Sequence, residues 1–166
     1  MADQEQPEPT VDELRSVLSR WASGVAVVTT NDGGLLYGLT VSSFTSVSLD
    51  PPLILVSLAN ANRLTSMIET SHGFAVSLLG ADQEAASNYF ARPGRLPTPD
   101  FTEIAGEWTP SGLPVIAGSL GWLTCSLHAV LPQGDHTLVI GRVNGAGGDP
   151  DQQPLLYWSR AYRRIT

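Results

Sequence analysis

The sequence has one cysteine, Cys125, among its 166 residues. A single chain therefore builds neither a disulfide framework nor a cluster of cysteine ligands around a metal. Its three histidines, His72, His128 and His136, lack the spacing of metal ligands, so no metal site is expected. This cysteine usage fits a reducing compartment, and we expect a cytoplasmic protein.

Basic residues are scarce as well: nine Lys and Arg stand against 16 Asp and Glu, for a net charge of −7. Nucleic acids and anionic membranes bind clustered basic side chains, so neither is expected as a partner. No apolar run reaches the roughly 18 residues of a membrane-spanning helix, and residues 1–8 lack the apolar segment of a signal peptide. Charged residues make up only 15%, which leaves part of the surface uncharged or covered by a second subunit.

The common phosphate-binding and hydrolase motifs are missing, since no G-x-G-x-x-G, G-x-x-x-x-G-K-[ST], G-x-S-x-G or H-E-x-x-H occurs. The glycine-rich segment 145–148 follows a predicted strand and leads into a loop that contains Asp and Pro, so we predict a turn there. The sequence therefore offers no standard phosphate-binding loop.

Residues 1–9 are predicted to form a disordered leader, because they carry charge, Gln and Pro but little to bury. Order is expected from Thr10, where Thr10 and Glu13 have the spacing of a capping box. The apolar residues that follow recur on one helical stripe: Val11, Leu14, Val17, Leu18 and Trp21. We predict a short amphipathic helix that lies on a larger body, within one domain over residues 10–166.

Beyond this helix the pattern changes to short apolar and β-branched runs separated by turn residues. The predicted strands are residues 25–30, 35–42, 53–58, 74–79, 119–131, 137–145 and 154–158, with a hairpin turn at 31–34. Helices are predicted over 62–70 and 82–90, the second with Asp82 as its N-cap, and 92–114 is expected to be an irregular excursion. This pattern favours a closed or partly closed barrel over a sandwich or a doubly wound parallel sheet.

A segment rich in hydroxyl groups, residues 38–52, leaves one predicted strand and ends at Pro51 and Pro52. It contains no basic residue. Its main-chain N–H groups and small hydroxyls are donors that suit a neutral, flat, acceptor-rich ring such as isoalloxazine. The alternative is an edge strand whose Ser and Thr side chains face water, and the residues alone leave both interpretations open.

Two further segments carry candidate chemistry. In residues 57–66 a strand end meets a helix start, where free N–H groups, Arg63 and Thr65 or Ser66 would complete an anion site; the alternative is an ordinary helix cap with a solvated arginine. In the second segment Asp135 would orient His136 by a hydrogen bond and leave the imidazole to contact a cofactor. An Asp-His pair at a hairpin is equally consistent with turn chemistry.

These three segments, in this order, resemble the short-chain flavin reductases of two-component flavin monooxygenases, a flavin reductase-like family with an FMN-binding split barrel. The resemblance covers about residues 11–166. It begins at residues 21–30 and continues through 38–44, 46–52, 74–79, 134–136 and 154–157. Each match is short, and their ordered combination is specific.

The resemblance implies a mainly β fold with short flanking helices: a split, Greek-key-like β-barrel that forms a homodimer with flavin at the interface. It implies exchangeable FAD or FMN and NADH as cofactors, with reduced flavin passed to a separate monooxygenase. Hydride transfer by proximity and orientation needs no catalytic acid, base or nucleophile. With no basic cluster evident for a 2′-phosphate, NADH is expected rather than NADPH.

The resemblance also assigns contacts. The residues that would hold the isoalloxazine ring are Thr40, Val41, Ser42 and Ser43. Those that would line the ribityl and phosphate end are Ser57, Leu58, Ala59, Asn62 and Ser66. Phe90 and Arg92 would close over the flavin phosphate or adenylate, although they also fit a packed aromatic and a solvated charge. His136 would lie near the nicotinamide, bordered by Tyr157 and Tyr162, for which plain core or interface packing is the alternative.

Two other functions are consistent with the residues. One is a tight flavin-binding redox carrier that never releases its cofactor. The other is a non-catalytic dimeric binding module in which the hydroxyl-rich segment is only an edge strand. A yellow protein after gel filtration would favour the carrier, whereas weak flavin binding would favour a reductase that uses flavin as a substrate.

Overall fold

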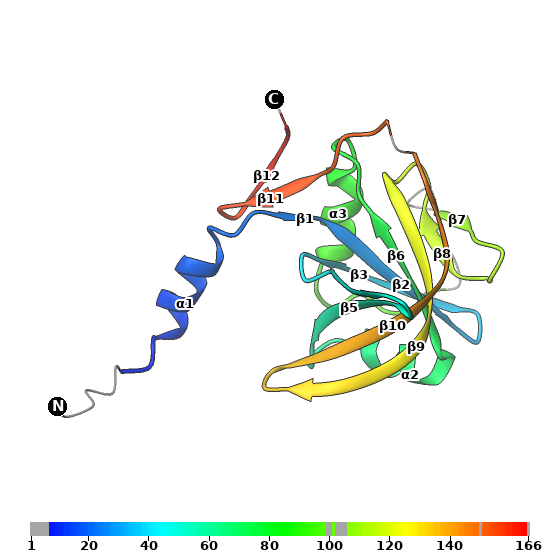
Figure 1. Ribbon diagram of the computed structural model, residues 1–166, viewed down its shortest axis with the longest axis horizontal. Helices are drawn as coiled ribbons and strands as arrows, with labels where there is room; N and C mark the ends of the chain where they lie inside the picture. The colour runs from blue at the N-terminus through cyan, green and yellow to red at the C-terminus, as the bar shows by residue number, and fades with distance from the viewer. Residues whose placement is uncertain (1–6, 99–100, 102–105, 150, 166) are drawn as a thin grey trace.

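The computed structural model describes residues 7–98, 101, 106–149 and 151–165. They form a mainly β protein with three short helices, which confirms the expected class (Figure 1). The helices are α1 (Val11–Leu18), α2 (Leu64–Ser71) and α3 (Glu84–Ala91). The strands are β1 (Ser23–Gly24), β2 (Ala26–Asp32), β3 (Leu35–Val41), β4 (Thr45–Leu49), β5 (Pro52–Ala59), β6 (Gly73–Leu78), β7 (Gly106–Trp108), β8 (Pro114–Ile116), β9 (Gly121–Gln133), β10 (His136–Gly148), β11 (Leu156–Trp158) and β12 (Ala161–Arg163).

Seven strands form the main antiparallel sheet, in the order β3-β2-β6-β9-β10-β5-β4. The sheet coils, so that β3 and β5 approach each other although four strands separate them in the order. Two smaller sheets stand beside it, β1-β11-β12 and β7-β8. Within the hydroxyl-rich segment, residues 45–49 form the edge strand β4, as the alternative interpretation of that segment expected. β5 begins at Pro52, and a proline is tolerated at the first position of a strand.

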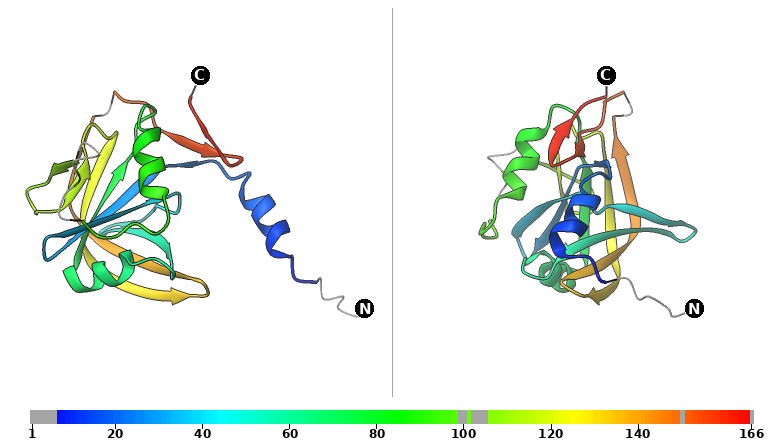
Figure 2. Two further views of the ribbon diagram at one scale, coloured as in Figure 1. Left: turned by 180° about the vertical axis from the view of Figure 1, so that it is seen from behind. Right: turned by 90° about the vertical axis from the view of Figure 1, so that its left-hand side faces the viewer.

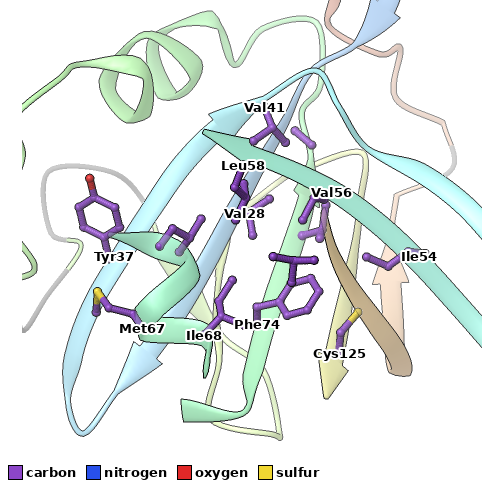
Figure 3. Close-up of a cluster of buried hydrophobic side chains, with 14 residues drawn as sticks. Val28, Tyr37, Val41, Ile54, Val56, Leu58, Met67, Ile68, Phe74 and Cys125 are labelled. Atoms are coloured by element: carbon purple, nitrogen blue, oxygen red, sulfur yellow. The ribbon is translucent and has the colours of Figure 1, made fainter. Parts of the chain in front are cut away.

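The main core fills the inside of the coiled sheet (Figure 3). Val28, Val56, Ile68 and Phe74 come from different elements and point toward one another, and each is fully buried. A second cluster lies on the other face of β2, where Val27 packs with Phe90 of α3 and with other residues. Both faces of β2 are therefore covered, which explains its continuous apolar run.

The β2–β3 hairpin turns at Gly33 and Gly34, whose φ angles are +60° and +94°. A two-residue hairpin loop of this kind favours glycine because both positions lie in the left-handed region. Asn31 supports the turn, since its side-chain oxygen accepts the Gly34 N–H at 2.9 Å. The turn predicted over residues 31–34 is confirmed.

The turn predicted at residues 145–148 is wrong, because β10 continues through Gly148. Side chains of the neighbouring strand β9 cross these glycines. A Cβ atom on Gly145 would lie 2.5 Å from Thr124 Oγ1, and one on Gly147 would lie 2.5 Å from the Trp122 ring. Glycine is needed here because the β9 side chains occupy the space that a Cβ atom would take, and not because the chain reverses.

Two other local expectations need correction. The N-cap of α3 is Gln83 rather than Asp82; the Gln83 side chain accepts the Gly80 N–H at 3.0 Å and donates to the Ala117 carbonyl at 2.9 Å, which fixes the turn before the helix. The excursion over 92–114 is not wholly irregular, because β7 pairs with β8. Residues 99–100 and 102–105 of that excursion, and residues 1–6 of the expected leader, lie outside the described residues.

Helix α1 has the predicted capping box, with the Thr10 and Glu13 side chains bonded to each other's main chain. It extends away from the sheet, and none of its residues is buried (Figures 1 and 2). Val11 and Val17 are each 63% exposed. The expectation that this helix lies on a larger body is therefore wrong within one chain. In the described part of the chain, no helix has the length and apolar character needed to cross a membrane.

Cys125 faces the core between Phe74 and Gly141. Burial raises the pKa of its thiol to about 12, so the thiol stays protonated and poorly nucleophilic near neutral pH. The cysteine is a packing residue.

Gly141→Ala is expected to lower the free energy of unfolding by about 1–3 kcal/mol. The new Cβ atom would lie 2.4 Å from the Phe74 ring and 2.7 Å from Cys125 Cβ, so the core would have to shift. Urea unfolding followed by tryptophan fluorescence measures the loss. Gly24→Ala is the control, because nothing lies within 4 Å of that position. Equal stability of the two variants would contradict this description of the core.

Candidate functional site

A hollow of about 180 Å³ lies where β3 ends, between α3 and the C-terminal hairpin formed by β11 and β12. We call it the inner pocket. Its lining residues are Val25, Thr40, Val41, Ser42, Ser87, Ala91, Tyr157 and Tyr162. Five of them are site residues predicted from the sequence, from segments more than a hundred positions apart.

One wall of the inner pocket is the end of β3 and the chain that follows it. β3 is an edge strand, so the outer side of its main chain has no neighbouring strand at Thr40 and Val41. Residues 42–44 lie between β3 and β4 and belong to neither strand. This wall therefore offers main-chain donors and small hydroxyls, without a charged side chain.

Ser43 ties this wall to the end of β5. Its hydroxyl donates to the Ser57 carbonyl at 2.7 Å and accepts the Ser57 N–H at 3.1 Å. The structure thus brings together the first two segments that sequence analysis had singled out.

Ser87 of α3 joins the two walls of the inner pocket. The residue is fully buried, its carbonyl accepts a hydrogen bond from Thr40 Oγ1 at 2.7 Å, and its hydroxyl lies 2.8 Å from the hydroxyl of Tyr162. Tyr162 also donates to Asn88 Oδ1 at 3.2 Å, and its ring packs against Tyr157 with centroids 5.5 Å apart. Sequence analysis missed Ser87 and Asn88, because their partners lie 47 to 75 positions away and leave no local signal.

The second group of predicted residues lies at the end of β5 and the start of α2: Ser57, Leu58, Ala59, Asn62 and Ser66. The Leu58 side chain is fully buried, so only its main chain is open to a ligand. Asn62 accepts the Leu64 N–H at 3.0 Å, and the Ser66 hydroxyl donates to the Arg63 carbonyl at 2.9 Å. Asn62 and Ser66 therefore already have partners within the chain, whereas the buried hydroxyl of Thr65, in the same helical turn, has none among the described residues.

His136 begins β10 and pairs with Ala59 of β5. The expected hydrogen bond to Asp135 is present, with His136 Nδ1 2.7 Å from Asp135 Oδ1. This bond, the charge of the imidazole and, more weakly, the positive charge of Arg15 hold the pKa of Asp135 below its usual range. The His136 side chain is half-exposed and does not line the inner pocket.

Phe90 and Arg92 lie at opposite extremes of burial. The Phe90 ring is fully buried against Gly38, with edge contacts to Tyr89 and Phe101, whereas Arg92 is exposed.

A different arginine, Arg95, joins the end of α3 to β3. Its guanidinium donates to the Gly38 and Phe90 carbonyls and stacks on the rings of Tyr37, Tyr89 and Phe90 at 5.0–5.3 Å from their centroids. Arg95 thereby caps the end of α3 and holds the loop after it against β3. Sequence analysis did not single it out.

A larger hollow of about 600 Å³ adjoins the inner pocket, and we call it the vestibule. It lies between α1 and the C-terminal hairpin, and it shares Ser42 and Tyr157 with the inner pocket. The other residues that line it are Asp12, Arg15, Leu18, Ser19, Trp21, Ser23 and Arg160. Across residues 7–98, 101, 106–149 and 151–165, no three His, Cys, Asp or Glu side chains are grouped to hold a metal ion.

The sequence is similar to that of known flavin reductases. Residues 18–166 match the family model described as a flavin reductase like domain. An NADH-dependent flavin reductase from Rhodococcus sp is 40% identical over 162 residues, which cover 96% of this chain and 89% of that protein. The reductase component of 4-hydroxyphenylacetate 3-monooxygenase from Thermus thermophilus is 36% identical, over 93% of this chain and 96% of its own length.

A solved structure extends the similarity to three dimensions. The NADH:FAD oxidoreductase of Streptomyces globisporus C-1027, determined in complex with NAD and FAD fragments, has a TM-score of 0.87 and 34% identity. The match covers 93% of this chain and 92% of that one. The coiled sheet, the order of the motifs and these matches together place the chain in the flavin reductase-like family.

Proposed function

We propose that the protein passes a hydride from NADH to an exchangeable FAD or FMN and releases the reduced flavin to a separate monooxygenase. The observation that carries the proposal is the inner pocket, in which hydroxyls and main-chain groups of residues 40–42 face a pair of tyrosines. Several relatives are named NADH-dependent flavin reductases or reductase components of monooxygenases, which supports the same reaction here.

The lining of the inner pocket fits a planar, uncharged, acceptor-rich ring. The edge of β3 and Ser42 supply donors for ring oxygen and nitrogen atoms, and Tyr157 supplies an aromatic surface. A bound flavin supplies the redox chemistry, by accepting the hydride. The remaining predicted contacts, at Ser57, Leu58, Ala59, Asn62, Ser66, Phe90, Arg92 and His136, belong to this proposal.

The contribution of the chain to the reaction is binding and orientation. Among the described residues, no carboxylate, histidine or cysteine lines the inner pocket, and direct hydride transfer needs none of them. Main-chain donors at residues 40–43 would stabilise negative charge on the reduced ring. Ser87 and Tyr162 would act as positioning residues, because they hold the C-terminal hairpin at a fixed place over this wall.

The reaction is tested with purified protein, NADH and free FAD or FMN. NADH absorbance is expected to fall at a rate proportional to protein concentration, and the protein is expected to be colourless after gel filtration because flavin exchanges. No loss of absorbance above the protein-free rate would contradict the proposal. A protein that stays yellow and turns over no added flavin would identify a redox carrier instead.

Tyr162→Phe is expected to raise the flavin KM about five- to tenfold, because it removes the hydrogen bonds to Ser87 and Asn88 that hold the hairpin. The kcat at saturating flavin should change little. Tyr157→Phe is the matched control: it keeps the ring and removes a hydroxyl that has no hydrogen-bond partner among the described residues. Steady-state kinetics measure both, and equal effects of the two variants would exclude the positioning role.

We also propose that residues 10–166 act as one domain, which works in the cytoplasm as a split-barrel homodimer. Helix α1 has eight residues, and isolated helices shorter than roughly 12 residues are marginal in water. Its outward apolar residues Val11, Leu14 and Val17 are 48–63% exposed, so the helix needs a surface that its own chain does not supply. A second copy supplies that surface.

Val17→Glu is expected to raise the dimer dissociation constant about tenfold or more, because it places an unpaired charge in the apolar contact. Sedimentation velocity over a range of concentrations measures the change. Leu35→Glu is the control, since Leu35 is comparably exposed but lies at the β2–β3 turn, away from α1 (Figure 1). A wild-type protein that sediments as a monomer at all concentrations would contradict the homodimer.

A further inference from the structure

Two arginines that form no ion pair with a described carboxylate line the vestibule, although Arg15 lies near enough to Asp135 for its charge to lower the pKa of that carboxyl. The chain as a whole is acidic, yet Arg15 and Arg160 meet there with one acidic residue, Asp12. The only ion pair among the described residues joins Asp135 to His136, so neither arginine has a carboxylate of that part of the chain within 4.0 Å. The vestibule thus has a net positive lining that the composition of the chain does not predict.

The two sides of α1 serve different surroundings. Asp12, Arg15 and Ser19 recur at helical spacing and line the vestibule. Of the apolar stripe, Leu18 and Trp21 line the vestibule as well, whereas Val11, Leu14 and Val17 do not. Burial of Val11, Leu14 and Val17 against a second copy would therefore leave the Arg15 side of the helix directed at the vestibule.

Arg160 is held at the vestibule by the C-terminal hairpin. Ser159 and Arg160 form the turn between β11 and β12, both with positive φ. The hairpin is fastened to the end of α1 by hydrogen bonds from Trp158 Nε1 to the Arg20 carbonyl and from the Ser159 N–H to the Ser19 carbonyl, at 3.0 and 2.8 Å. The elements that carry the two arginines are therefore fixed to each other.

The vestibule also adjoins the proposed redox site. Ser42 and Tyr157 line both hollows, so a ligand whose ring occupies the inner pocket can extend past these residues into the vestibule. Its volume of about 600 Å³ falls within the roughly 300–1,000 Å³ of ordinary ligand sites. Leu18 and Trp21 add an apolar wall, which suits a ligand that is only partly charged.

We propose that the vestibule binds the pyrophosphate of a dinucleotide, NADH or FAD, through Arg15 and Arg160. This inference rests on the proposed function, because the reactive ring of the same ligand would lie in the inner pocket. For FAD it places the pyrophosphate in the vestibule instead of at residues 57–66 and Arg92, and Asn62 and Ser66 there already have partners within the chain. A guanidinium matches phosphate oxygens by paired hydrogen bonds, and two such groups balance the two negative charges of a pyrophosphate. The pyrophosphate occupies a site without any glycine-rich loop, consistent with the absence of such a motif.

The test compares dinucleotides with the mononucleotides that lack the pyrophosphate. Arg15→Gln and Arg160→Gln are assayed with NADH and with reduced nicotinamide mononucleotide, using FMN as acceptor, and their affinities for FAD and FMN are measured by flavin fluorescence. Either the NADH KM or the FAD Kd is expected to rise about tenfold, with the mononucleotide values unchanged. The pair that responds identifies which dinucleotide reaches the vestibule.

Arg142→Gln is the control, because Arg142 is an exposed arginine of β10 that does not line the vestibule. Unchanged preference for dinucleotides in both variants would overturn the inference. So would an equal loss of mononucleotide and dinucleotide affinity, which would assign the arginines to the packing of α1.

Calorimetry with ADP separates this inference from the proposed function, since it needs no turnover. The wild-type protein is expected to bind ADP, and the double variant about tenfold more weakly. A protein that fails to oxidise NADH but shows this arginine-dependent binding would refute the reductase and keep the vestibule site. No ADP binding by a wild-type protein that is active as a reductase would overturn the vestibule site alone.

Discussion

The inner pocket depends on the hydrogen bonds of one buried residue, Ser87. Its carbonyl holds Thr40 at the end of β3, and its hydroxyl holds Tyr162 of the C-terminal hairpin. Ser87 lies on α3, which packs on β2 and β3. The wall formed by the end of β3 and the wall formed by the C-terminal hairpin are therefore both bonded to the same helix. A site that works by orientation requires this, since small displacements of one wall would misalign the reacting rings.

The C-terminal hairpin also holds α1 in place. Tyr162 and Tyr157 face the inner pocket, while Trp158 and Ser159 bond the main chain at the end of the helix. A helix that no described part of its own chain covers is thus held in a defined direction, with Asp12, Arg15 and Leu18 toward the vestibule. The hairpin thus connects the inner pocket, the vestibule and the helix that carries the proposed subunit contact.

Much of the fold was predictable from the sequence, because strands such as β2 and β6 are continuous apolar runs and the Gly33–Gly34 turn is a strong local signal. The prediction of a turn at residues 145–148 was wrong because these glycines make room for Trp122 and Thr124 of the neighbouring strand β9, which the local sequence does not show. The hydroxyls near Thr40 were visible in the sequence, whereas Ser87 was not, since its partners are distant. The apolar stripe of α1 was also visible, but a sequence does not say which chain covers it.

The central claim is that residues 40–43 and the C-terminal hairpin together hold a flavin ring with one side open to a hydride donor. A crystal structure of the protein with FAD and NAD tests it most directly. We expect the isoalloxazine in the inner pocket, against the main chain of residues 40–43 and within reach of Tyr157. An empty inner pocket in crystals saturated with flavin, or a ring bound elsewhere on the sheet, would contradict it.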